Sequence, residues 1–133
     1  EDALKAYKNA YALKSNKIAY YYNIGICYIA LNERSNSIKY FQKAVNIKPK
    51  SLEDYLSLAN IYREIAKEGK ALDIYDKLIS KDLARAYSHY KKAEIYEKNA
   101  SYRKMKRELE KIIELDPNAA LATQAKIKLE QYN

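Results

Sequence analysis

The sequence predicts an all-α fold in which antiparallel pairs of helices stack as a solenoid and a last helix caps the stack. Three consecutive segments of equal length, 18–51, 52–85 and 86–119, align with one another without gaps. Apolar residues recur within them at spacings of three and four, which places these side chains on one face of a helix. Glycine and proline occur only twice each in 133 residues, and their scarcity favours long helices over short strands.

Equivalent positions of the three segments carry side chains of one kind. In the first half of each segment one position is always small: Gly25, Ala59 and Ala93. Further along stands a tyrosine in every segment: Tyr28, Tyr62 and Tyr96. The second half carries pairs of apolar or aromatic residues: Phe41 with Ala44, Tyr75 with Leu78, and Leu109 with Ile112. Small side chains let two helices approach closely, and the large ones fill the space beside them.

These positions resemble the tetratricopeptide repeat family, whose pattern is an aromatic residue, Leu, a small residue and Tyr, then a small residue, an aromatic residue, Ala and Pro. The resemblance covers essentially the whole chain. It implies a right-handed superhelix of antiparallel helix pairs, in which the first helix of each pair lines the concave side. It also implies a domain order of a preceding repeat's second helix at 1–17, repeats at 18–51, 52–85 and 86–119, and a capping helix at 120–133.

The first of these parts rests on Ala3, Tyr7 and Ala10, which continue the phase of the pattern backwards. Since the chain begins inside a repeat, we expect it to be a piece of a longer protein. The last part rests on Ala122, Ala125, Leu129 and Tyr132, which form one apolar stripe against a polar back. A solenoid cap needs such a one-sided helix.

Periodicity places helices at about 1–14, 18–31, 35–47, 52–66, 70–81, 85–99, 102–114 and 118–132, with no strand. Gly69 is expected to end one helix in a left-handed cap, and Pro49 and Pro117 are expected to separate neighbouring helices. Leu83 stands where the other two segments have proline. The junction around Leu83 is therefore expected to run more continuously helical than the others.

The resemblance implies that the concave groove receives a peptide or a partner's helix. The candidate groove residues are Tyr22, Asn23, Ile26, Ser57, Asn60, Arg63, Tyr87, Tyr90, Lys91 and Glu94. Asn23 and Asn60 can bond to a peptide backbone, because an amide both donates and accepts. Arg63 and Lys91 can hold a carboxylate. The alternative is that these side chains pack against a neighbouring helix or are simply solvated.

Some members of this family bind the C-terminal carboxylate of chaperones through a clamp of Lys, Asn and Arg side chains. The matching positions here are Tyr22, Ile26, Ser57, Tyr87 and Lys91. Only Lys91 has a suitable charge, so a chaperone C-terminus is not an expected partner.

Catalytic and metal chemistry find little support in the sequence. His89 occupies a position where an aromatic side chain packs, and Cys27, the only cysteine, is expected to be a buried structural thiol. No cluster has metal-ligand spacing and no glycine-rich phosphate loop occurs, so we expect neither enzyme activity nor a cofactor. No apolar run is long enough for a membrane span. A single cysteine slightly favours a reducing compartment such as the cytoplasm.

The formal net charge of +8 leaves two other functions open. Basic residues crowd the second helices of the first and third repeats, at Lys39, Lys43, Lys48, Lys50, Arg103, Lys104, Lys106, Arg107 and Lys111. They can contact a nucleic acid or another anionic surface, although a solvated face is the simpler interpretation because Glu108, Glu110 and Glu114 interrupt the run. A purely structural role, with self-association through the N-terminal end, is the third possibility.

Overall fold

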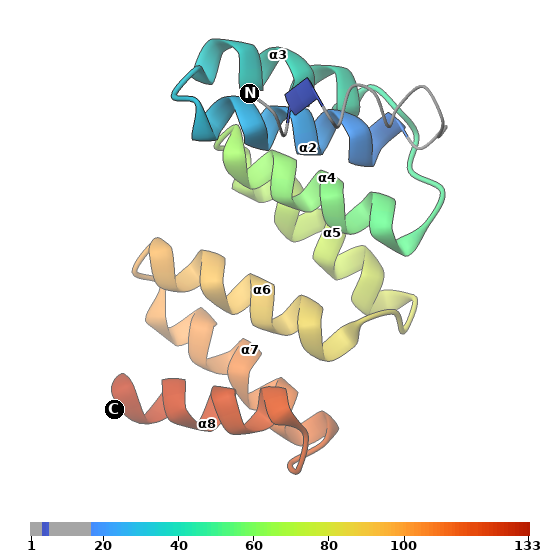
Figure 1. Ribbon diagram of the computed structural model, residues 1–133. Coiled ribbons are helices and arrows are strands. Elements are labelled where there is room, and N and C mark those ends of the chain that lie inside the picture. The colour runs from blue at the N-terminus through green and yellow to red at the C-terminus, as the bar shows by residue number, and fades with distance from the viewer. Residues whose placement is uncertain (1–3, 6–16) are drawn as a thin grey trace. The chain divides into compact units, whose positions relative to one another are not determined.

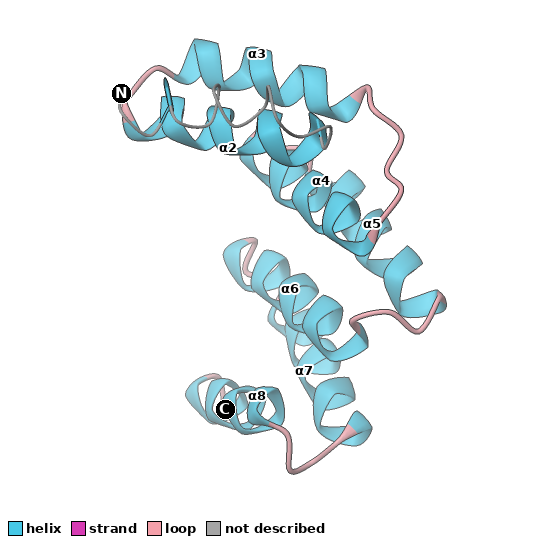
Figure 2. Cartoon of the chain, turned by 45° about the vertical axis from the view of Figure 1, so that its right-hand side comes forward, coloured by secondary structure: helices cyan, strands magenta, loops and turns pink. Residues whose placement is uncertain are grey.

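A computed structural model describes residues 4–5 and 17–133, and Figure 1 shows how the chain runs through its helices. The expected helix at 1–14, together with Ala3, Tyr7 and Ala10, lies outside the described residues apart from the helical pair Leu4 and Lys5. The remaining helices are α2 (Lys17–Ala30), α3 (Arg34–Val45), α4 (Leu52–Glu64), α5 (Glu68–Ser80), α6 (Arg85–Lys98), α7 (Tyr102–Leu115) and α8 (Ala120–Gln131). Their bounds lie within a few residues of the predicted ones. In the described part of the chain every element is a helix or a loop, as Figure 2 shows, so the all-α class is confirmed.

The chain divides into two compact units, Glu1–Ala71 and Leu72–Asn133, and the division falls inside α5. In unit 1, α2 packs against α3 and α4, and α3 also contacts α4. In unit 2, α6 packs against α7, and α8 covers parts of α7 and α6. Each unit therefore contains the helix hairpin that the repeat pattern predicts.

Repeat positions form the cores of both units. The small residues Gly25, Ala59 and Ala93 are all buried. The three pairs in the second helices are also buried, with at most 1% of each residue exposed: Phe41 with Ala44, Tyr75 with Leu78, and Leu109 with Ile112. Gly25 shows why the small position in the first helix of a repeat cannot hold a larger side chain. A Cβ atom there would lie 2.7 Å from Cδ1 of Phe41, closer than two carbon atoms can approach without displacement.

The first helix of each segment ends in the same backbone turn. The residue with positive φ is Asn32, Ala66 or Ala100, at φ of 61°, 60° and 57°. In each turn the next residue donates its N–H to the carbonyl of the repeat tyrosine, as Glu33 does to Tyr28 at 2.8 Å, Lys67 to Tyr62 at 2.7 Å and Ser101 to Tyr96 at 2.8 Å. This pattern is a Schellman cap, which satisfies carbonyls that the helix end leaves unpaired.

The expected left-handed cap at Gly69 is wrong. Gly69 is the second residue of α5, and none of the described glycines has positive φ. Ala66 takes the left-handed conformation instead, because the cap position is set by the repeat register. An alanine there bears a steric cost of about 1 kcal/mol, which the two hydrogen bonds of the cap offset.

The expectation of a more continuous helix around Leu83 is also wrong. α5 ends at Ser80, and left-handed residues follow at Asp82 (φ 59°) and Ala84 (φ 47°). The N–H of Leu83 bonds to the carbonyl of Leu78 at 2.9 Å. A Schellman cap thus ends α5 without a proline, and the chain reverses before α6 begins.

Candidate functional site

Six of the ten predicted binding residues lie in unit 1, on two helices that pack against each other. α2 carries Tyr22, Asn23 and Ile26, and α4 carries Ser57, Asn60 and Arg63. All six are partly exposed. The Tyr22 ring centroid lies 6.3 Å from that of Phe41, so this side chain also packs inside the hairpin. The structure therefore places the predicted residues of α2 and those of α4 in one unit, and Tyr22 also contributes to the core of that unit.

Asn23 and Asn60 are the predicted residues of α2 and α4 whose side-chain amides are free to bind a ligand. Neither side-chain amide has a hydrogen-bond partner among residues 17–71. Each amide offers two donors and an acceptor, which is what a main-chain peptide group needs from a binding surface. Both residues are partly exposed, so a ligand can reach them.

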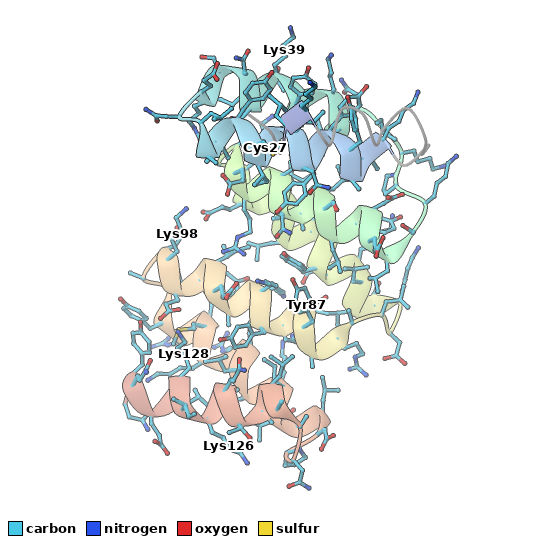
Figure 3. The ribbon with its side chains drawn as sticks, viewed as in Figure 1. Cys27, Lys39, Tyr87, Lys98, Lys126 and Lys128 are labelled. Carbon is cyan, nitrogen blue, oxygen red and sulfur yellow. The ribbon has the colours of Figure 1, made fainter. Side chains whose placement is uncertain are left out.

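The other four predicted residues lie on α6 in unit 2, where Figure 3 labels Tyr87. Tyr87 is 36% exposed, and Tyr90 packs against the core around Ala93 and Met105. The Lys91 ammonium lies 3.1 Å from Oε1 of Glu94 and 5.3 Å from the centroid of the Tyr87 ring. Lys91 therefore already has a carboxylate and an aromatic ring beside it, and a ligand carboxylate would compete with Glu94.

A buried ionic cluster in unit 2 was missed by the sequence analysis. His89 Nδ1 lies 2.8 Å from Oε1 of Glu108, and the Lys92 ammonium lies 3.5 Å from the same oxygen. Lys92 also donates to Asp76 at 2.6 Å. His89, Lys92 and Glu108 are 5%, 8% and 6% exposed. His89 is buried as expected, but its partner is a carboxylate.

The surroundings keep Glu108 and Lys92 in their charged forms. Burial raises the pKa of Glu108, yet the hydrogen bond from His89 and the charges of Lys92 and Lys111 outweigh it, so the pKa lies below its usual value. Burial likewise lowers the pKa of Lys92, and Asp76 and Glu108 more than compensate, which leaves the pKa raised. Alignment of the repeats could have indicated this cluster, because the first segment has Tyr21, Ile24 and Tyr40 where the third has His89, Lys92 and Glu108.

A second polar cluster holds α8 in place. The Glu97 carboxylate on α6 accepts a hydrogen bond from the Tyr132 hydroxyl and lies 3.1 Å from the Lys128 ammonium. The Tyr132 ring stacks on Tyr102 with centroids 4.8 Å apart. The bond from Tyr132 lowers the pKa of Glu97, and the same bond raises the pKa of Tyr132 to about 12. Both partners of Glu97 come from the C-terminal end of the chain, 31 and 35 residues further on.

The basic residues of α3 and α7 belong to different units. On α7, Arg103, Lys104, Arg107 and Lys111 are exposed and Lys106 is partly exposed. Lys39, Lys43, Lys48 and Lys50 are exposed as well. Two of these ammonium groups lie over aromatic rings: Lys104 lies 5.7 Å from the centroid of the Tyr96 ring, and Lys43 lies 4.9 Å from that of Tyr40.

Cys27 is partly exposed, so the expectation that this thiol is buried is wrong. It lies on α2 one residue past Ile26, outside the fully buried stripe of Ile24 and Gly25. Among the described residues no group of three or more His, Cys, Asp or Glu side chains is arranged to hold a metal ion. No helix within that part of the chain has the length and apolar character that crossing a membrane requires.

Comparison with known proteins agrees with the repeat register. Residues 86–119 match the family model described as tetratricopeptide repeat, which coincides with the third predicted segment. Residues 1–70 match the family model described as regulator of microtubule dynamics protein 1-3. Superkiller protein 3 of Saccharomyces cerevisiae is 27% identical over 70 residues, a match that covers 53% of this chain and 5% of the yeast protein.

Proposed function

We propose that this chain binds a peptide or helix of a partner protein along α2 and α4. The chain belongs to the tetratricopeptide repeat family and, through residues 1–70, to the family of regulator of microtubule dynamics protein 1-3. Tetratricopeptide repeats generally mediate protein–protein interaction, and proteins of this family are typically scaffolds without enzyme activity. The predicted residues of α6 stay candidates for a further contact within unit 2.

The observation that carries this proposal is the pair of unpaired amides on two packed helices of unit 1. Asn23 and Asn60 lack partners among residues 17–71, and both remain partly accessible. Because both amides remain accessible and unpaired, they can donate to and accept from the main chain of a bound peptide. Ile26 on the same stretch of α2 adds apolar contact.

Peptide selection tests the proposal without a known partner. Peptides are selected from a random displayed library on the intact chain, and the dissociation constant of the best peptide is then measured for the double variant Asn23→Ala with Asn60→Ala. We expect binding to weaken about tenfold or more, since two hydrogen bonds to the ligand are lost. The matched control is Asn118→Ala with Asn133→Ala, which removes two exposed amides elsewhere. Equal affinity of both double variants would refute the assignment to α2 and α4.

The match over residues 1–70 favours a microtubule as one candidate partner, since the matched family is described by its regulation of microtubule dynamics. Co-sedimentation of the chain with polymerised tubulin tests this directly. The amount of chain in the pellet is expected to rise with tubulin concentration and to saturate. A pellet no larger than that of an unrelated basic protein at the same salt concentration would exclude a specific contact.

A further inference from the structure

Unit 1 contains an open groove of about 430 Å³ that none of the ten predicted binding residues lines. It runs along α3 and past the turn between α4 and α5. Its basic residues are Arg34, Lys67 and Lys70, and its apolar ones include Ile38, Val45 and Ile65. The volume falls within the range of about 300–1,000 Å³ that is usual for ligand pockets.

The lining carries three cations and no carboxylate side chain. The Arg34 guanidinium donates to the main-chain carbonyl of Glu64 at the end of α4, which holds its side chain against the groove. The Lys70 ammonium lies 5.8 Å from the centroid of the Tyr62 ring. Lys67 forms no ion pair with any acidic residue in the described part of the chain. The three cations of the lining therefore face the groove without a carboxylate of the lining beside them.

The groove also has an apolar side. Arg34, Ile38 and Val45 are spaced along one face of α3, so this face is cationic at its start and apolar along its length. Ile38, Val45 and Ile65 are all partly exposed. A nucleic-acid backbone would cover the cations and leave these apolar side chains in contact with water. A ligand that carries both carboxylates and apolar side chains matches the whole surface.

We propose that this groove binds a short acidic segment of a partner protein. Carboxylates of the segment lie against Lys67 and Lys70, with Arg34 offering its remaining N–H donors. An apolar side chain of the segment covers Ile38, Val45 and Ile65. This surface is separate from the α2 and α4 residues of the proposed function, so either site can exist without the other.

Fluorescence anisotropy with a labelled synthetic peptide of alternating glutamate and leucine tests the proposal on the intact chain. The double variant Lys67→Glu with Lys70→Glu is expected to weaken binding about tenfold or more, because attraction to the peptide becomes repulsion. The matched control is Lys39→Glu with Lys48→Glu, two exposed lysines outside the lining that undergo the same change of charge. The control is expected to stay within about threefold of the unchanged protein. Circular dichroism spectra confirm that the variants remain helical.

Two further probes separate the acidic peptide from other anions. Replacing the leucines of the peptide by serine is expected to weaken binding about fivefold or more, since apolar contact with Ile38 and Val45 is lost. A single-stranded oligo-uridine of equal charge is expected to bind more weakly than the peptide. Equal losses in both lysine variants, no effect of the serine replacement, or tighter binding of the oligo-uridine would each overturn the proposal.

Discussion

Nδ1 of His89 and Oε1 of Glu108 lie 2.8 Å apart, and both side chains are buried where α6 packs against α7. Lys92 approaches the same carboxylate from one turn further along α6. The first segment has tyrosine, isoleucine and tyrosine at the three equivalent positions. Unit 2 thus replaces part of an apolar core by charges, and its stability depends on those charges remaining paired.

The first prediction concerns acid. The folded protein lowers the pKa of Glu108 below its ordinary value of 4.5, so the stabilisation is complete above that value and is lost as pH falls through the folded pKa. The free energy of unfolding in urea is measured by circular dichroism between neutral and acidic pH. Glu108→Gln is expected to be less stable at neutral pH and to lose less stability on acidification. Identical pH profiles for the two proteins would contradict this role of Glu108.

The second prediction separates breaking the cluster from replacing it. Lys92→Leu alone removes one of the cations beside Glu108, which keeps His89 and Lys111, and is expected to destabilise unit 2 by about 1–3 kcal/mol. The triple variant His89→Tyr, Lys92→Ile and Glu108→Tyr installs the residues of the first segment. We expect it to recover most of that loss, because packed apolar groups can replace a buried ion pair at little cost. Urea denaturation gives the free energy of unfolding of both variants. A triple variant that is less stable than Lys92→Leu would show that the apolar residues do not fit this site.

Most of the fold could be predicted from the sequence, because the repeat register fixes which positions are buried. Gly25, Phe41 and Ala44 were predicted from spacing alone, and all three are buried. The register could not reveal that charged residues at core positions are partners, since His89 and Glu108 lie far apart in the sequence. Only the packing of α6 on α7 brings them together.

The helix ends show a different limit of sequence reasoning. Glycine is the usual residue for a left-handed cap, and for that reason the sequence predicts the cap at Gly69. The cap falls on Ala66, at the position of Asn32 and Ala100 in the other segments. A shared backbone geometry thus outweighs residue preference. The ten binding residues stay a prediction, because the repeat register fixes which positions are buried and does not fix which exposed side chains meet a partner.

The third prediction uses the two glycines of the chain as a matched pair. Gly25→Ala places a Cβ against the Phe41 ring and is expected to destabilise unit 1 by about 1–3 kcal/mol. Gly69→Ala has nothing within 4 Å of its new Cβ and is expected to stabilise the chain by about 0.5–1 kcal/mol, since alanine favours the helix more than glycine does. Thermal denaturation of the two variants should move in opposite directions. If Phe41→Leu did not relieve the loss in Gly25→Ala, the clash with the ring would not be its cause.

The fourth prediction concerns the attachment of α8. Ala122 and Ala125 of this helix are fully buried, and Leu121 and Leu129 pack against the same core while staying partly exposed. The bonds of Glu97 to Lys128 and Tyr132 supply a second attachment near the end of the helix. Glu97→Gln removes the charge, so the ion pair is lost. Hydrogen exchange of the amides at 126–131 is therefore expected to become faster, while exchange in α7 stays unchanged.

The matched control for this attachment is Glu94→Gln, one turn earlier on α6. Its carboxylate lies 3.1 Å from the Lys91 ammonium of the same helix, whereas the bonds of Lys128 and Tyr132 go to Glu97. Amide exchange at 126–131 should therefore be the same in Glu94→Gln as in the unchanged protein. Faster exchange in both variants would mean that any loss of charge from α6 loosens α8, and the specific role of Glu97 would have to be abandoned.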